Sequence, residues 1–205
     1  MIRLYFKKII IKLITIYSNY SDVVYFKNKN LPLIISNNCW GSEFYKNLGV
    51  EYPTPFVGVF LYPKDYVNLI KVIDDLDVNK FEFTDNGNYF IGTFKGIDFH
   101  FLHYTSLSEI NHKFKRRLER FNSLKNERDI IVKLCDVDNA TFEDFYYLSK
   151  EIINKNGNYH FLLLSNRLKS QFVTQLDGWF YNNMPNGYEL FKTRKLYLNW
   201  NKFCE

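Results

Sequence analysis

The chain has 205 residues, of which 46% are hydrophobic and 24% charged, a composition typical of a folded globular domain and not of a disordered chain. Its formal net charge of +5 would suit a nucleic-acid surface, but the excess is local. Residues 1–30 hold six of the 27 basic residues and one of the 22 acidic ones, which leaves 21 of each in the rest. We therefore expect no nucleic-acid partner, and we divide the chain into a basic arm at 1–30 and one neutral domain at 31–205.

Residues 1–30 predict a basic amphipathic helix. At about 100° per residue, one face collects large apolar side chains: Ile2, Tyr5, Phe6, Ile9, Leu13, Ile16 and Tyr17. The other half carries Arg3, Lys7, Lys8 and Lys12. Such a helix can lie on an anionic membrane surface through residues 1–17, or its apolar face can pack on its own domain or on a second copy. Four apolar residues interrupt the polar face and argue against a freely solvated arm: Leu4, Ile10, Ile11 and Ile14.

The three cysteines, Cys39, Cys135 and Cys204, stand too far apart for a disulfide framework or a zinc pattern. Lysines interrupt every candidate signal-peptide core in the arm, and no run approaches about 18 apolar residues. We therefore expect a cytoplasmic protein, with the inner face of the cell membrane as the surface that the arm would reach.

From residue 31 onward, strand patterns alternate with helix patterns. Strands are predicted at 31–36, 56–61, 81–84, 89–94, 97–102, 129–134 and 159–164. Helices are predicted at 65–76, from Ser106 or Ser108 to Phe121, and at 141–150. Lys95-Gly96 indicates a hairpin and 182–187 a loop, while the rest of 166–205 is left unassigned. These patterns predict one layered α/β domain, with a mixed sheet because of the hairpin.

Polar clusters follow the predicted strands, where open α/β sheets form their sites. The clusters are Ser36–Trp40, His103-Tyr104, Asp136–Asp138 and Ser165-Asn166. Polar residues also end strands for purely structural reasons. We nevertheless expect the four clusters to meet in one cleft.

The string Ser36–Trp40 is the most unusual of these clusters. The amides of Asn37 and Asn38 and the indole of Trp40 suit a sugar or a nucleotide, and a helix start after Cys39 would favour an anion and lower the pKa of its thiol. A local turn network with Cys39 as a small buried residue accounts for the same string.

His103 is the candidate general base, because an imidazole takes and returns a proton near neutral pH. A hydrogen-bonded structural histidine is the alternative. Asp136-Val137-Asp138 is similar to the Asp-x-Asp of nucleotide-sugar transferases, in which the carboxylates hold Mg²⁺ or Mn²⁺ and the metal holds a diphosphate. A turn between a strand and a helix also favours aspartate for local reasons.

Arg117 and Arg120 lie opposite the apolar face of the predicted helix that ends at Phe121. Their guanidinium groups suit bidentate contacts with a phosphate. The alternative is an ordinary solvated helix face.

Distinctive strings run along residues 31–200: Ile35-Ser36-Asn37-Asn38-Cys39-Trp40-Gly41, Tyr45, Leu48-Gly49, Tyr52, Pro55-Phe56, Gly58, Asp65-Tyr66, His100–Tyr104, Arg117, Arg120, Asp136–Asp144 and Trp200. Together they resemble the DUF1919 family, bacterial proteins often labelled exopolysaccharide biosynthesis proteins. Ser42 stands where many members carry a second glycine, and Phe114 where they often carry Trp. The resemblance implies an α/β fold and a link to capsule or other surface glycans, and it assigns no catalytic residue.

These observations lead to a hypothesis of surface-polysaccharide assembly by a transferase that acts on an activated sugar or a lipid-linked glycan. In this hypothesis the ligand-binding residues are Ser36, Asn37, Asn38, Trp40, Tyr104, Arg117 and Arg120, His103 is the base, and Asp136 and Asp138 hold a metal or orient the base. A second hypothesis makes Cys39 a nucleophile paired with His103 in acyl transfer. A third makes the protein a non-catalytic glycan-binding or complex-organising subunit.

Overall fold

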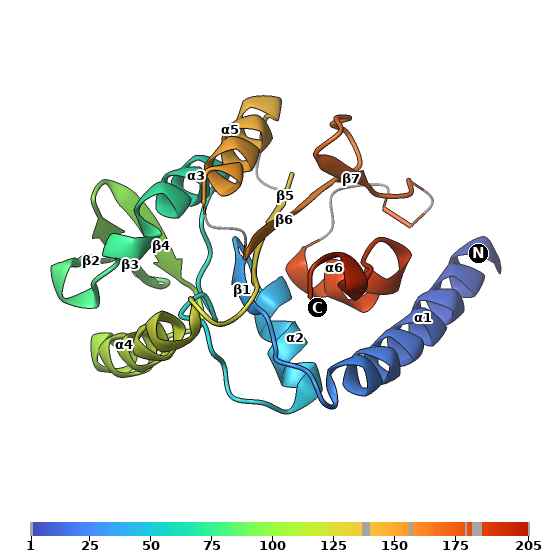
Figure 1. Cartoon of the computed structure of the whole chain (residues 1–205), viewed down its shortest axis with the longest axis horizontal. Helices are drawn as coiled ribbons and strands as arrows, with labels where there is room; N and C mark the ends of the chain where they lie inside the picture. The colour runs from blue at the N-terminus through green and yellow to red at the C-terminus, as the bar shows by residue number, and fades with distance from the viewer. Residues whose placement is uncertain (1, 137–139, 156–157, 179, 182–185, 205) are drawn as a thin grey trace.

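The computed structural model describes residues 2–136, 140–155, 158–178, 180–181 and 186–204, with side chains from Leu4 onward. It confirms the α/β class. Four parallel strands form one sheet in the order β1-β5-β6-β7, and an antiparallel sheet β2-β3-β4 stands beside it instead of joining it into one mixed sheet (Figure 1). The strands are β1 (Leu33–Ser36), β2 (Glu82–Asp85), β3 (Phe90–Phe94), β4 (Ile97–Phe101), β5 (Ile130–Cys135), β6 (Tyr159–Ser165) and β7 (Val173–Gln175).

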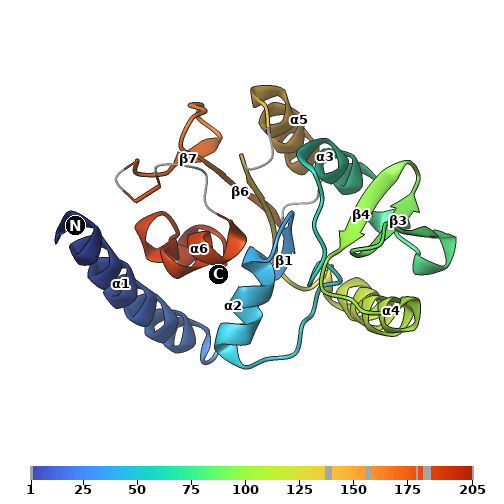
Figure 2. The same cartoon turned by 180° about the vertical axis from the view of Figure 1, so that it is seen from behind.

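Helices cover both faces of the parallel sheet (Figures 1 and 2). The α-helices are α1 (Ile2–Phe26), α2 (Trp40–Leu48), α3 (Pro63–Val72), α4 (Leu107–Leu124), α5 (Phe142–Ile153) and α6 (Gly187–Lys192). Short 3₁₀ turns are η1 (Ile73–Asp75), η2 (Val78–Lys80), η3 (Arg194–Leu196) and η4 (Trp200–Lys202). The segment 166–205, which the sequence patterns leave unassigned, contains the edge strand β7. It also contains α6, η3 and η4, which cover one face of the parallel sheet.

Alternate residues of each parallel strand face two separate cores. In β5, Ile130, Val132 and Leu134 join the core under α3, α4, α5 and the antiparallel sheet. Ile131 and Cys135 point to the other face and join the core under α2, α6 and the end of α1. Because both faces are covered, the strand is a continuous apolar run interrupted only by Lys133.

Several predicted elements are confirmed, and one is not. The turn at Lys95 and Gly96 has φ values of 51° and 74°, as a two-residue hairpin with two left-handed positions requires. The strand predicted at 56–61 does not form, since Gly58 has a φ of 74° and only Phe60 pairs, with His100. Left-handed backbone at Gly58 breaks the extended conformation that the apolar run alone suggested.

The arm at 1–30 forms helix α1, and it packs with the face opposite to its large apolar side chains. Ser18 and Asp22 are fully buried on the packed face, and Asp22 accepts hydrogen bonds from Arg194 Nε at 2.6 Å and from Trp200 Nε1 at 2.8 Å. Tyr5 and Leu13, on the predicted apolar face, are 67% and 61% exposed. The buried ion pair, together with the packing of Phe26 at the end of the helix, orients α1, whereas its large apolar face stays exposed.

We predict that Asp22→Ala destabilises the fold by about 3–5 kcal/mol, because it leaves the Arg194 guanidinium buried without its charged partner. Chemical denaturation measures the change in the free energy of unfolding. The matched control is Asp74→Ala, which removes a 56%-exposed carboxylate paired with Lys125 and Lys155 and costs about 1 kcal/mol or less. Equal losses for the two variants would contradict the structural role of Asp22.

Candidate functional site

The carboxyl ends of β1, β5 and β6 meet at one edge of the sheet because the three strands are parallel. Ser36 ends β1, Asp136 directly follows β5, and Ser165 ends β6. The structure therefore brings three of the four predicted polar clusters to one edge. The fourth, His103-Tyr104, comes from the antiparallel sheet, just after β4.

A buried lysine lies beneath this edge and was not predicted as a site residue. The Lys133 side chain is fully buried, and its Nζ lies 3.1 Å from Asn38 Oδ1, 3.5 Å from Asn37 Oδ1 and 3.2 Å from Cys135 Sγ. Among the described residues, no carboxylate forms an ion pair with it. Burial consequently lowers the pKa of Lys133, a shift that the neighbouring Cys135 opposes. The sequence does contain an indication of this buried lysine, because Lys133 is the one charged residue in the apolar strand β5.

Asn38 connects this lysine to the start of α2. Its Oδ1 accepts hydrogen bonds from Lys133 Nζ, from Ser36 Oγ at 3.3 Å and from the backbone N–H of Trp40 at 3.2 Å. A Cβ on Gly187 would stand 2.4 Å from the same oxygen, so only glycine allows α6 to approach so closely. Asn38 is therefore held from three sides, and its side chain is 7% exposed.

Asn37 faces the interior with part of its amide unused. The residue is fully buried, its backbone carbonyl accepts from Leu61 N–H at 3.1 Å, and its Nδ2 makes no hydrogen bond among the described residues. An unpaired buried amide costs about 1–3 kcal/mol, and the unused Nδ2 of Asn37 is therefore a candidate hydrogen-bond donor to a ligand.

Cys39 and His103 form the pair that stands at the surface of this edge. Cys39 Sγ lies 3.5 Å from His103 Nε2, with Cys39 half-buried and His103 exposed. Cys39 directly precedes α2, where the helix dipole favours negative charge. Burial and then the carboxylate of Glu43 nevertheless raise the pKa of the thiol, while Lys133 lowers it. The expected low thiol pKa is not found, so the thiol needs a base to become a nucleophile.

The loop that carries His103 is hydrogen-bonded to the segment around Gly58. His103 N–H donates to the Gly58 carbonyl at 3.4 Å, and a Cβ on Gly58 would come within 3.1 Å of His103 Cβ. Tyr104 OH donates to the Val57 carbonyl at 2.8 Å and accepts from Arg117 Nη1 at 2.8 Å. Arg117 and Tyr104 therefore act as buried supports for the histidine loop.

Other predicted ligand-binding residues are occupied inside the protein. Trp40 is fully buried and donates from Nε1 to Tyr197 OH at 2.8 Å. Arg120 donates to the Tyr52 carbonyl at 2.8 Å and pairs with Glu51. The indole and this guanidinium therefore already have hydrogen-bond partners within the chain.

The carboxylate of Asp136 is bound by Ser165, at the end of β6, and by Arg167, just after it. Its buried carboxylate accepts from Ser165 Oγ and from Arg167 Nε at 3.1 Å, and Oδ1 has no hydrogen bond among the described residues. Asp138 lies outside the described residues. Within the part of the chain that the structure describes, no cluster of His, Cys, Asp and Glu suits a metal ion.

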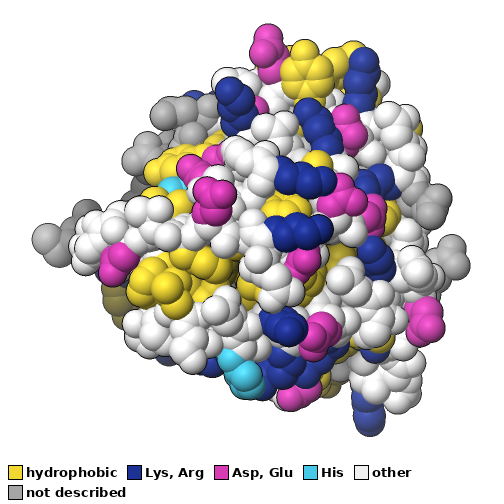
Figure 3. All heavy atoms as spheres, turned by 90° about the vertical axis from the view of Figure 1, so that its left-hand side faces the viewer, with side chains coloured by type: hydrophobic (Ala, Val, Ile, Leu, Met, Phe, Trp, Pro, Cys, Tyr) yellow, Lys and Arg dark blue, Asp and Glu magenta, His cyan; other side chains and the backbone are white. Residues whose placement is uncertain are grey.

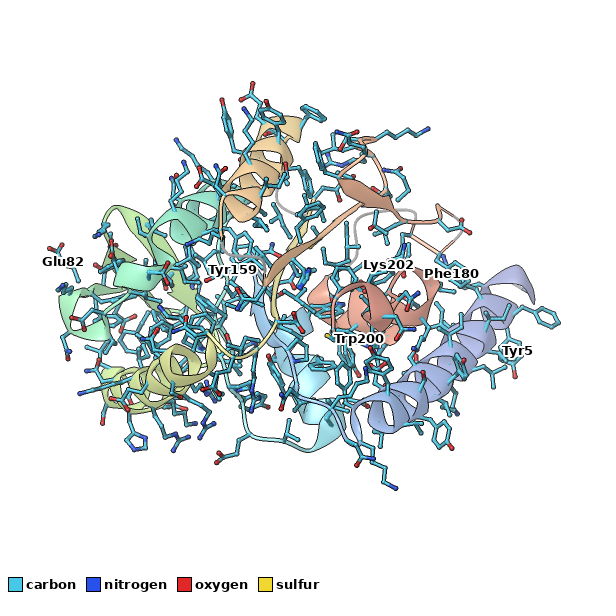
Figure 4. The ribbon with its side chains drawn as sticks, in the orientation of Figure 1. Tyr5, Glu82, Tyr159, Phe180, Trp200 and Lys202 are labelled. Atoms are coloured by element: carbon cyan, nitrogen blue, oxygen red, sulfur yellow. The ribbon has the colours of Figure 1, made fainter. Side chains whose placement is uncertain are left out.

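An open hollow of about 430 Å³ lies away from this site, at the amino end of β6. Tyr159 and Lys202, which Figure 4 labels, are among its lining residues, and no predicted site residue lines it.

Fold and site together define an α/β protein in which a cysteine after the parallel strand β1 meets a histidine after the antiparallel strand β4, beside a buried lysine of β5. The chain belongs to the DUF1919 family, described as a domain of unknown function, whose model matches residues 7–184. The match includes most of α1 and all of the site residues from Ser36 to Arg167.

A relative of this chain is an uncharacterized protein of Haemophilus influenzae, 30% identical over 112 residues. The similarity covers 54% of this chain and 52% of that protein, so it spans about half the length of the relative.

We predict that Glu43→Gln lowers the pKa of Cys39, because it removes the negative charge that raises it. At about pH 8 a lower thiol pKa gives more thiolate and faster reaction with iodoacetamide. The measurement is the alkylation rate of Cys39 against pH, resolved by peptide mass spectrometry from the buried Cys135 and Cys204.

Lys133→Met is predicted to shift the alkylation profile of Cys39 the opposite way, since Lys133 lowers the thiol pKa. Glu51→Gln, a change of the same type at an 81%-exposed side chain, is the control and should leave the profile unmoved. A Glu43→Gln profile that coincides with that of the native protein would disprove the assigned electrostatics.

Proposed function

We propose that this protein is a group transferase in which Cys39 is the nucleophile and His103 the general base. The observation that carries the proposal is the 3.5 Å approach of Cys39 Sγ to His103 Nε2, made by residues 64 positions apart. The raised pKa of Cys39 supports a paired mechanism, because a protonated thiol attacks only when a neighbour removes its proton.

The reaction has two steps that balance without a redox partner. In the first, Sγ attacks the carbonyl carbon of an acyl donor while His103 Nε2 takes the thiol proton, and the leaving group departs with that proton. In the second, an acceptor hydroxyl gives its proton to His103 and attacks the thioester, which returns the thiol to Cys39. The buried Asn37–Asn38 turn holds Cys39 in place during both steps.

The class of acceptor rests on the family. We propose a hydroxyl of a surface glycan or a lipid-linked glycan, in line with the exopolysaccharide label attached to proteins of this type. Acyl transfer is favoured over transfer of a sugar from a nucleotide, because Trp40 and Arg120 are engaged in internal contacts. A metal-bound diphosphate would need Asp136, of which one carboxylate oxygen, Oδ2, is already bound by Ser165 and Arg167.

The proposal predicts a covalent acyl group on Cys39. Incubation with p-nitrophenyl acetate should release p-nitrophenol in a burst, and mass spectrometry should find the acetyl group on the peptide that contains Cys39. Cys39→Ala should abolish both signals. His103→Asn should slow acylation by about 10²–10⁴-fold, the usual contribution of a general base.

His112→Asn is the matched control, since it removes an exposed imidazole on α4 away from Cys39 and should acylate at the native rate. Acetylation of lysines with an unmodified Cys39 would refute the mechanism. Saturable glycan binding without any covalent product would instead favour the non-catalytic subunit.

A further inference from the structure

The outward face of α1 is an uninterrupted apolar stripe. It consists of Tyr5, Phe6, Ile9, Leu13, Ile16 and Tyr20, which are 40–70% exposed. At about 100° per residue these six positions fall within about 100° of arc, and from Tyr5 to Tyr20 they extend over about 22 Å. We call this surface the outer stripe. Tyr5 projects away from the body of the protein, whereas Trp200 lies between α1, α2 and α6 (Figure 4).

The C-terminal part of α1 is anchored on the body of the protein. Arg194 donates to Asp22 and, at 3.0 Å, to Asn19 Oδ1, and Phe26 packs edge-to-face against Phe44 and Trp200. These contacts fix the rotation of α1 about its axis. A contiguous apolar surface that a rigid scaffold holds in solvent is typical of an interaction site.

Charges beside the outer stripe select its partner. Lys8 and Lys12 are exposed along one border of the stripe. The sole acidic residue of positions 1–30 is Asp22, which is buried against Arg194. The opposite side of the molecule, over β2–β4 and α4, intersperses basic with acidic side chains (Figure 3). Among the described residues, neither Lys8 nor Lys12 forms an ion pair with a carboxylate.

We infer that the outer stripe of α1 docks on an anionic lipid bilayer, with the helix in the plane of the surface. Its tyrosines and aliphatic side chains enter the headgroup boundary, and Lys8 and Lys12 meet lipid phosphates. A second copy fits less well, because pairing two stripes gathers Lys8 and Lys12 of both helices, while the carboxylate of each helix, Asp22, is buried against Arg194. No helix in the described residues is long and apolar enough to cross a membrane.

Vesicle flotation with the full chain tests this inference. The protein should float with phosphatidylcholine vesicles that contain about 30 mol % phosphatidylglycerol, and far less with phosphatidylcholine alone. Lys8→Gln/Lys12→Gln should bind the anionic vesicles about thirtyfold more weakly, which corresponds to about 1 kcal/mol for each lysine near the surface. Leu13→Asn/Ile16→Asn should lose more than tenfold in affinity, because both side chains leave the acyl boundary.

A matched control removes similar apolar area elsewhere. Tyr147→Asn/Ile153→Asn changes two side chains of α5 that are 52% and 62% exposed, and it should bind vesicles as the native chain does. All variants should keep the native thermal midpoint, since each replaced side chain faces solvent. Cys39→Ala should also bind normally, which separates this inference from the proposed chemistry.

Two outcomes would overturn the inference. One is unchanged flotation of Leu13→Asn/Ile16→Asn. The other is a concentration-dependent dimer in sedimentation, abolished by the same substitutions, with no flotation of the native chain. The second result would assign the outer stripe to a second copy.

Discussion

The arrangement of the sheet edge depends on one buried amine. Taking the Lys133 side chain out of water costs several kcal/mol, of which its two amide contacts and one thiol contact return a part. Those partners come from the turn after β1 and from β5 itself, so the amine ties two strands together at the point where each ends. Asn38 then receives the first N–H of α2, and the beginning of that helix fixes Cys39. The position of the Cys39 thiol therefore depends on a lysine side chain that is fully buried.

The sequence predicted correctly those elements that neighbouring residues alone determine, such as turns and helix caps. The hairpin at Lys95-Gly96 follows from two left-handed positions, and α5 begins at Thr141 because Thr141 and Asp144 form a capping box. The strand wrongly predicted at 56–61 failed because an apolar run does not reveal backbone conformation. There, Gly58 adopts a positive φ to let the His103 loop approach.

The orientation of α1 and the surroundings of the candidate site residues depend on contacts between residues far apart in the sequence, which the sequence patterns could not predict. A helical wheel identified the two faces of α1, but the partner of Asp22 is Arg194, 172 positions away, and no periodicity could reveal it. Arg117 illustrates the same limit, since no pattern in the sequence could reveal its buried hydrogen bond to Tyr104. The Ser36–Trp40 string was singled out for its composition, and the structure divides it between internal contacts and one half-buried thiol.

The close approach of Gly187 to Asn38 also affects the order in which parts of the protein fold. Residues 186–204 form the outer wall of the core that contains Trp40 and Cys135, and they lie far along the chain from the Asn38 turn that they cover. Until that wall docks, the oxygen that receives the Lys133 amine stays open on one side. Burial of the Lys133 amine is therefore completed only when residues 186–204 dock, which couples the desolvation of this lysine to a long-range contact.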